Sequence, residues 1–376
     1  MALGGGIAAP VTIEVVAQDG EARAGVLHTS HGVVETPAFM PVGTKGTVKG
    51  LTPGDLRSIG AGVVLGNTYH LYLRPGADLV REAGGLHDFT GWDGPMLTDS
   101  GGYQVFSLAK TRSISEEGVE FASVYDGSIH SFTPELTTRV QEDLGADVAM
   151  VLDECPPAGV DREYQAQSLR RTARWAERCK VAHGKEDQAL FGIVQGGLFA
   201  DLRRESLERT VGIGFDGYAV GGLSVGESRE EMLATLAVVA PELPADKPRY
   251  FMGIGDPVGV LQVISLGVDM FDCVLPTRLA RHGAALTADG RINLRNARFR
   301  RDLGPLDPEC GCEACTGYSR AYLAHLVRED ELLGHRLITL HNVYFMTHLC
   351  REAREAIVEA QFEEWSRTWI ERFHGS

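Results

Sequence analysis

Two aspartates lie in segments where a carboxylate could do chemistry. Asp99 is followed by two glycines and by Tyr103, and glycines let the backbone approach a ligand closely. Asp272 is embedded among apolar residues, where a carboxylate is costly unless it has a partner or a chemical task. The ordinary alternatives are a turn for Asp99, and a helix cap or an ion pair with Arg278 for Asp272. A pair of acids is also the minimum for cleaving a glycosidic bond by double displacement, with one acid as nucleophile and the other handling protons.

A cysteine cluster predicts a metal site. Three of the seven cysteines are Cys310, Cys312 and Cys315, and three thiolates within six residues suit tetrahedral Zn²⁺. Nothing in the spacing indicates a catalytic ion, so we expect a structural one. A fourth ligand is needed, and the spacing leaves five candidates open: His325, His335, His341, His348 and Cys350.

The charge of the chain is acidic overall but basic in one segment. The net charge of −15 argues against nonspecific binding of polyanions. Between Arg278 and Arg301, however, Asp289 is the one acid. Seven arginines lie in that segment: Arg278, Arg281, Arg291, Arg295, Arg298, Arg300 and Arg301. We call these seven the arginine strip, and it is either a solvated basic loop or a local phosphate-binding surface.

Length and composition fit a globular enzyme. A chain of 376 residues with 44% apolar residues can form one barrel-sized domain with an appendage or two ordinary domains. No segment approaches the roughly 20 apolar residues of a membrane span. The first residues lack a basic segment followed by an apolar one, so we expect no signal peptide and a cytoplasmic protein.

Eight short apolar runs alternate with helical patterns, which predicts a (β/α)₈ barrel of the α/β class, with a doubly wound open sheet as the alternative. The predicted helices are 162–182, 201–211 and 227–239, and Thr133-Pro134 and Asp256-Pro257 are helix-start signals. The predicted strands are Phe39–Val42, Val63–Gly66, Met96–Thr98, Val148–Leu152, Leu190–Val194, Tyr218–Gly221, Tyr250–Gly253 and Val268–Phe271.

We expect one catalytic domain over residues 1–376. Two stretches within it interrupt the alternation of strands and helices. Residues 102–133 are rich in Gly, Ser, Thr and Val, which predicts an inserted β-hairpin. Residues 277–350 hold the arginine strip and the cysteine cluster, and we expect a zinc-binding subdomain there. From about Ser319 the chain has the pattern of charged amphipathic helices.

The barrel predicts where the polar residues meet, because active sites of such barrels lie at the C-terminal ends of the strands. Asp99, Asp153, Gln195, Gly222 and Asp272 follow the third, fourth, fifth, sixth and eighth predicted strands. We therefore expect these five positions to converge on one mouth.

Across nearly its whole length the sequence resembles the tRNA-guanine transglycosylases. The resemblance is carried by long motifs: TPAFMPVGT at 36–44, GNTYHL at 66–71, DSGGYQ at 99–104, LDEC at 152–155, GIVQGG at 192–197, GGLSVGE at 221–227, MGIGDP at 252–257 and FDCVLPTR at 271–278.

The resemblance implies a role for each matching position. Asp272 matches the nucleophile that attacks the ribose of the target guanosine, and Asp99 matches the general acid/base. The family's groups that hydrogen-bond the edge of the purine correspond to Asp153, Gln195, Gly222 and Leu223. The family's side chains that sandwich the purine ring correspond to Tyr103 and Met252. Ser100 and Cys155 fall in the same substrate site.

The resemblance also implies partners and a cofactor. It selects His341 as the fourth ligand of one Zn²⁺ beside Cys310, Cys312 and Cys315. It places Arg278 and Arg281 against the tRNA anticodon loop, and relatives form homodimers. Many relatives have Asn where Leu279 and His282 stand here, so the anticodon contacts at those two positions differ.

Two residues indicate the branch of the family. Val225 and Cys155 match bacterial members, which use 7-aminomethyl-7-deazaguanine (preQ1), whereas eukaryotic members tend to have Gly at the position of Val225 and accept queuine. The resemblance implies exchange of guanine at the wobble position of tRNAs with GUN anticodons (Asp, Asn, His, Tyr), in queuosine biosynthesis. The competing hypotheses are a noncatalytic RNA-binding paralogue and a barrel glycosidase.

Overall fold

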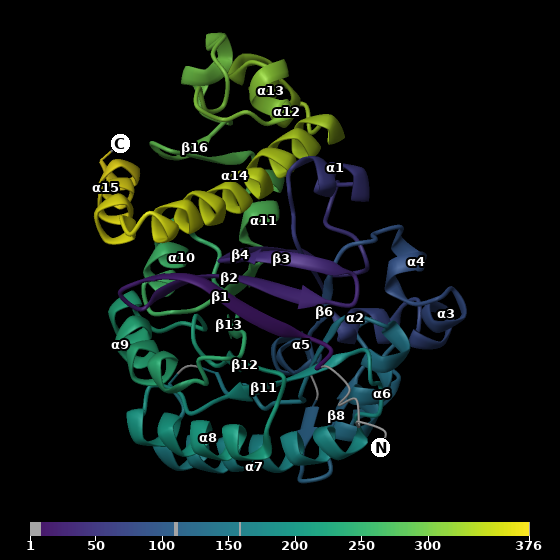
Figure 1. The fold of residues 1–376 in the computed structure, drawn as a ribbon. Coiled ribbons are helices and arrows are strands. Elements are labelled where there is room, and N and C mark those ends of the chain that lie inside the picture. The colour runs from purple at the N-terminus through teal and green to yellow at the C-terminus, as the bar shows by residue number, and fades with distance from the viewer. Residues whose placement is uncertain (1–8, 109–111, 158, 376) are drawn as a thin grey trace, which may run out of the picture.

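The fold is a closed barrel of eight parallel strands, seen in a computed structural model that describes residues 9–108, 112–157 and 159–375 (Figure 1). The first strand pairs with the last, Phe39 opposite Phe271, which closes the ring and excludes the open sheet. All eight predicted strands are therefore confirmed. In chain order they are β4 (Ala38–Gly43), β5 (Val64–Gly66), β6 (Met96–Thr98), β10 (Val148–Met150), β11 (Ala189–Val194), β12 (Gly217–Val220), β13 (Arg249–Phe251) and β14 (Met270–Cys273).

Helices connect the strands, and side-chain caps fix where several of them begin. Thr133 accepts a hydrogen bond from the Leu136 N–H, and Asp256 accepts one from the Gly259 N–H, as the helix-start signals predicted. The helices on the barrel are α1 (Pro53–Ser58), α2 (Thr68–Leu73), α3 (Ala77–Glu82), α4 (Leu86–Thr90), α6 (Pro134–Leu144), α7 (Arg162–Ala182), α8 (Ala200–Ile213), α9 (Arg229–Val239) with the 3₁₀ turn η1 (Ala240–Glu242), α10 (Pro257–Ile264) and α11 (Leu275–Arg281).

An N-terminal antiparallel sheet, which we did not predict, packs against one end of the barrel. It consists of β1 (Thr12–Asp19), β2 (Ala22–Thr29) and β3 (Gly32–Thr36), the purple strands of Figure 1. Arg23 donates to both carboxylate oxygens of Asp269, at 2.7 and 2.5 Å. Asp269 directly precedes β14, so the sheet lies at the end of the barrel where the strands begin.

The segment 102–133 holds more than the predicted hairpin. It begins with α5 (Gly102–Leu108) and continues as three antiparallel strands, β7 (Arg112–Ile114), β8 (Val119–Ala122) and β9 (Ile129–Phe132). Phe121 and Phe132 pack against Tyr69 of α2, with ring centroids 5.4 and 6.4 Å from the tyrosine ring. The insertion therefore supports the helix that follows β5.

The C-terminal part forms a subdomain joined to the barrel by one long helix. The subdomain contains β15 (Ala284–Thr287), β16 (Gly290–Asn293), η2 (Ala297–Arg301), α12 (Glu313–Gly317) and α13 (Arg320–Arg328). Helix α14 (Leu332–Val358) runs from it along the barrel to α15 (Phe362–His374), which confirms the predicted C-terminal helices (Figure 1). Among the described residues no helix is long and apolar enough to cross a membrane.

Candidate active site and metal cluster

The predicted polar positions lie at the end of the barrel where the strands finish. Asp99 and Gln195 directly follow β6 and β11, and Asp153 and Gly222 lie in the loops after β10 and β12. Asp272 lies inside β14 rather than after it, because the last strand begins two residues later than the predicted Val268–Phe271. Since all eight strands are parallel, the five positions share one end of the barrel.

The carboxylate of Asp99 is held by four donors. The N–H of Thr68 and that of Gly101 donate to Oδ1 at 2.8 and 3.2 Å. The side-chain amides of Asn67 and Gln104 donate to Oδ2 at 2.5 and 2.8 Å. Thr68 is the first residue of α2, so Asp99 accepts one of the N–H groups that a helix leaves unpaired at its start. Sequence reasoning assigned no role to Asn67 or Thr68.

Burial raises the pKa of Asp99 to about 6, although the hydrogen bonds from Thr68, Asn67 and Gln104 oppose the shift. The negative charge of Asp272 contributes to the same increase. The Asp272 carboxylate therefore lies near enough to Asp99 to favour the protonated form of Asp99.

The Asp272 carboxylate is oriented through one oxygen. Its Oδ1 accepts hydrogen bonds from the Tyr250 hydroxyl at 2.6 Å and the Gly253 N–H at 2.9 Å. These are the partners that the sequence left open, in place of an ion pair with Arg278. Burial raises the pKa of Asp272, and the two hydrogen bonds limit that increase. Because the described hydrogen bonds use Oδ1, Oδ2 is the oxygen that remains for a substrate.

Asp153, Gln195 and Ser100 form a buried polar group beside these acids. The Gln195 amide donates to Asp153 Oδ2 at 2.7 Å, and the Ser100 hydroxyl donates to Oδ1 at 3.3 Å. Burial raises the pKa of Asp153 to about 6. Gln195 is 1% exposed, and its Oε1 has no hydrogen-bond partner among the described residues. A buried acceptor without a donor costs about 1–3 kcal/mol, so this atom fits a donor supplied by a ligand.

The loop after β12 needs glycine beside Gln195. Gly222 has φ +65°, and a Cβ there would lie 2.2 Å from Gln195 Oε1. The buried Arg203 of α8 fixes the same backbone, because its guanidinium donates to the carbonyls of Gly221 at 2.7 Å and Gly222 at 3.3 Å. The neighbouring Leu223 is 3% exposed. Arg203 was missed because its partners are backbone atoms distant in sequence.

The other predicted substrate residues differ in exposure. Tyr103 on α5 is 53% exposed, and Met252, after β13, is partly buried. That these two side chains sandwich a ring stays a prediction. Cys155 is buried, and burial raises the pKa of its thiol to about 12, so this cysteine is protonated at neutral pH.

The loop that carries Val225 is fixed by a carboxylate. Glu227 accepts hydrogen bonds from the N–H of Ser224 and from that of Val225, the latter at 3.0 Å. Ser224 has φ +61°, a conformation that is uncommon for a residue with a side chain. The two hydrogen bonds from Glu227 hold that conformation and so set the position of Val225.

The subdomain contains a cluster of three cysteines and one histidine. The Sγ atoms of Cys310, Cys312 and Cys315 lie 3.6, 3.5 and 3.3 Å from His341 Nδ1. A tetrahedral zinc ion, bonded at about 2.3 Å to sulfur and 2.0 Å to nitrogen, sets such separations at about 3.5 Å. The other ring nitrogen of His341 lies 2.6 Å from the Leu286 carbonyl, so it donates there and leaves Nδ1 for an ion. The four residues therefore fit a structural metal, and the spacing alone could not have selected His341.

One residue of α14 connects this cluster to the helix that follows β14. Asn342, next to His341, donates to the carbonyls of Pro276 and Ala284 at 3.0 Å each and accepts from the Leu286 N–H at 2.9 Å. Pro276 lies in α11, which follows Asp272. The cysteine–histidine cluster and the helix after β14 are therefore held by adjacent residues, His341 and Asn342.

The arginine strip lies on the surface. All seven side chains are exposed, and none forms an ion pair with a described carboxylate. Arg278 and Arg281 lie in the last turn of α11, and three others lie in η2. Exposed, unpaired cations favour the phosphate-binding interpretation over a loop neutralised by neighbouring acids.

Comparisons with known proteins show the family of the chain. The queuine tRNA-ribosyltransferase family model matches residues 18–375. A queuine tRNA-ribosyltransferase of Solidesulfovibrio magneticus is 57% identical over 356 residues, 94% of this chain and 95% of that protein. The one from Desulforamulus reducens is 53% identical over 367 residues, 97% of this chain and 99% of that protein. The chain therefore belongs to the queuine tRNA-ribosyltransferase family.

Proposed function

We propose that this protein is a tRNA-guanine transglycosylase that replaces guanine at the wobble position of tRNAs with GUN anticodons by preQ1. The observation that carries the proposal is the pair Asp99 and Asp272, which lie at the same end of the barrel, where the charge of Asp272 helps to raise the pKa of Asp99. Family membership supplies the reaction class. A noncatalytic paralogue has no use for a buried Asp99 and a partly buried Asp272, each held by its own set of donors.

The proposed reaction is a double displacement at ribose C1′. Asp272 Oδ2 attacks C1′, the bond from C1′ to the guanine N9 breaks, and Asp99 gives a proton to the departing base. In the second half Asp99 takes a proton from preQ1, whose N9 attacks C1′ and releases Asp272. The proton on Asp99 is thus restored. A pKa of about 6 suits this role, because both protonation states are accessible near neutral pH.

Recognition of the base uses the buried polar group. Asp153 and the unpartnered Gln195 Oε1 are acceptors, and a guanine-like edge presents N–H donors. The backbone at Gly222 and Leu223 pairs with the remaining polar atoms of the base edge. The two faces of the ring are covered by Tyr103 and Met252. The same site is lined by Ser100 and Cys155. Because Asp272 must reach C1′, the target nucleotide has to leave its stack.

The choice of preQ1 rests on Val225 and Cys155. Val225 is partly buried and lies in the loop fixed by Glu227, where a smaller residue would leave space for a bulkier base such as queuine. We therefore infer that the enzyme prefers the aminomethyl compound.

We infer that the Cys310, Cys312, Cys315 and His341 cluster holds one Zn²⁺ per chain. Bound zinc would supply cross-linking rather than chemistry, because the four ligands close a tetrahedron. Through Asn342 it would hold α11 with Arg278 and Arg281, which we place against the anticodon loop. Two copies of the chain are proposed to act together as a homodimer.

The test is incorporation of labelled guanine into bacterial tRNA, with Asp272→Asn as the control. We expect label in tRNA with the wild type, none with the variant, and release of the label by preQ1 but not by queuine. Absence of label with metal-loaded wild type would favour a noncatalytic RNA-binding protein. Release of the label by queuine alone would overturn the inference from Val225, and hydrolysis of aryl glycosides would point to a glycosidase.

A further inference from the structure

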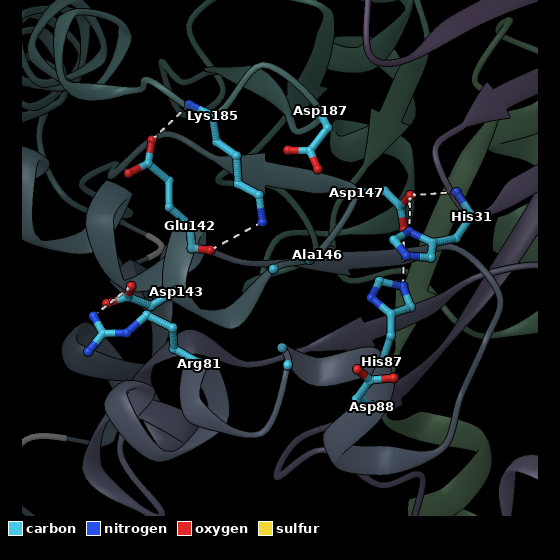
Figure 2. Close-up of a pocket in the computed structure, with 13 residues that line it drawn as sticks. His31, Arg81, His87, Asp88, Glu142, Asp143, Ala146, Asp147, Lys185 and Asp187 are labelled. Atoms are coloured by element: carbon cyan, nitrogen blue, oxygen red, sulfur yellow. Dashed lines mark hydrogen bonds and ion pairs between the residues drawn. The ribbon is translucent and has the colours of Figure 1, made fainter.

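A second cluster of metal-ligating side chains lies at the opposite end of the barrel from Asp99 and Asp272. His31 is in the turn between β2 and β3, His87 is in α4, and Asp147 directly precedes β10 (Figure 2). One ligand atom from each residue lies within 4.8 Å of the other two. Three segments far apart in sequence therefore bring two imidazoles and a carboxylate together.

Asp147 is the fixed member of the cluster. Its side chain is 1% exposed, and its oxygens accept hydrogen bonds from the Met96 N–H at 2.8 Å and the His31 N–H at 3.1 Å. The two backbone donors thus orient the carboxylate before any ligand arrives.

The two histidines share this carboxylate. His31 Nδ1 lies 2.8 Å from Oδ1 of Asp147, and His87 Nε2 lies 3.4 Å from Oδ2 of Asp147 and 3.1 Å from the Gly94 carbonyl. Because both neighbours of His87 Nε2 are acceptors, this nitrogen releases its proton when it binds an ion. The imidazole rings are stacked, with centroids 3.5 Å apart and an interplanar angle of 13°. Parallel rings do not aim at one point, so one ring must turn to share an ion. His31 can do so, because its side chain is 39% exposed in a surface turn.

An acidic cavity of about 440 Å³ opens beside the cluster (Figure 2). Of its two basic residues, Arg81 is paired with Asp143 at 3.1 Å, and Lys185 Nζ lies 3.4 Å from the Glu142 carbonyl. The remaining carboxylates attract a cation, and the cavity has room for water ligands. The acids that line it are Asp88, Glu142, Asp143, Asp147 and Asp187.

We propose that His31, His87 and Asp147 bind a divalent transition-metal ion, with waters from the cavity completing its coordination. Two imidazoles favour an ion such as Zn²⁺ or Co²⁺ over Mg²⁺, which prefers oxygen ligands. The ion joins the β2–β3 turn to the start of β10, so its role is structural. This proposal is independent of the proposed reaction.

Metal stoichiometry of the full-length protein tests the proposal. After loading with Co²⁺ and removal of free ion, native mass spectrometry should find two ions per chain in the wild type and one in His87→Ala. His31→Ala, a change in a surface turn, should also bind one. The matched control is His28→Ala, an exposed residue of β2 outside the cluster, and it should keep two. One ion in the wild type, or two in both cluster variants, would overturn the site.

The absorption spectrum of bound Co²⁺ distinguishes the two sites. An ion at the Cys310 cluster gives a thiolate-to-cobalt charge-transfer band, whereas a site of two imidazoles and a carboxylate has none. We expect the second equivalent to add weak visible bands without charge transfer, and His87→Ala to remove only those bands. A second equivalent that increases the charge-transfer band would contradict the proposal.

Discussion

At the residue scale, the site combines buried carboxyl groups with donors that hold each of them in one orientation. The pKa values of Asp99, Asp153 and Asp272 are all raised by burial. Each also accepts at least two hydrogen bonds. Burial makes protonation of Asp99 and Asp153 accessible near neutral pH. At Asp272 the two donors to Oδ1 leave Oδ2 for a substrate.

Replacing the side-chain donor to Asp272, the proposed nucleophile, tests this balance. In Tyr250→Phe, Asp272 Oδ1 loses the 2.6 Å hydrogen bond that lowers its pKa, so that pKa rises further. The acidic limb of kcat/KM should move to higher pH, and activity should fall more at pH 6 than at pH 8. The control is Tyr218→Phe, which changes a buried tyrosine on the neighbouring β12. Identical pH profiles for both variants would show that Tyr250 does not act through Asp272.

Stability against pH tests the burial of Asp153. Its folded-state pKa of about 6 exceeds the ordinary 3.8, so the ionised group destabilises the fold above pH 6 and has no such effect below about pH 4. Asp153→Asn should therefore raise stability at pH 7.5 by up to about 3 kcal/mol. Gln195 can rotate its amide so that Oε1 accepts from the new side chain.

Thermal unfolding of Asp153→Asn at the two pH values is the measurement. The gain should be present at pH 7.5, absent at pH 4, and accompanied by a higher KM for guanine, because an acceptor for the base is lost. Equal gains at both pH values would mean that the charge of Asp153 is not their cause.

The sequence predicted the acids of the site better than the residues that hold them. Asp99, Asp153, Gln195 and Asp272 follow strands that apolar runs predict, so barrel geometry alone brought them together. Asn67, Tyr250 and Arg203 could not be found in this way. Their roles depend on contacts between distant segments, which local patterns do not encode.

At the element scale, α8 positions the loop that carries Gly222. Arg203 is fully buried and donates to the Val194, Gly197, Gly221 and Gly222 carbonyls. One arginine therefore fixes the ends of β11 and β12 relative to each other.

Arg203→Lys tests this role, because an ammonium cannot span the same carbonyls. We expect a loss of about 2–4 kcal/mol of stability from acceptors left unpaired, and a higher KM for guanine with a smaller change in kcat. The control is Arg204→Lys, next in the helix but exposed and paired with Glu242 at 3.3 Å. Equal behaviour of both variants in unfolding and kinetic assays would refute a positioning role.

Elements were predicted where the period of the pattern was clear. The helix expected at 162–182 has those bounds, and all eight barrel strands were found. The β1–β3 sheet was missed because most residues of β1 are exposed and an irregularity between Val15 and Ala17 interrupts the alternation along the strand. The 102–133 insertion has three strands, whereas a hairpin has two. The additional strand was missed because β7, the first of the three, has only three residues.

At the scale of the whole molecule, a net charge of −15 coexists with seven exposed arginines on one segment. The arginine strip favours docking of RNA, whereas the acidic charge on the rest of the protein repels RNA.

The salt dependence of tRNA binding tests the strip. If Arg300 and Arg301 each contact one phosphate, changing both to Ala weakens the salt dependence, so the magnitude of the slope of log affinity against log salt falls by about 2. Arg170→Ala is the control, because that exposed residue of α7 pairs with Glu205 at 2.8 Å. A slope unchanged by the double variant would place the RNA elsewhere.

The most direct test of the account is the covalent intermediate on Asp272. Enzyme incubated with tRNA and free guanine, then denatured, should yield a protein–tRNA adduct that survives gel electrophoresis. Peptide mapping should place the bond on Asp272. Asp272→Asn should give no adduct while still binding tRNA, since the arginine strip is intact. An adduct on another residue, or one formed by Asp272→Asn, would contradict the central claim.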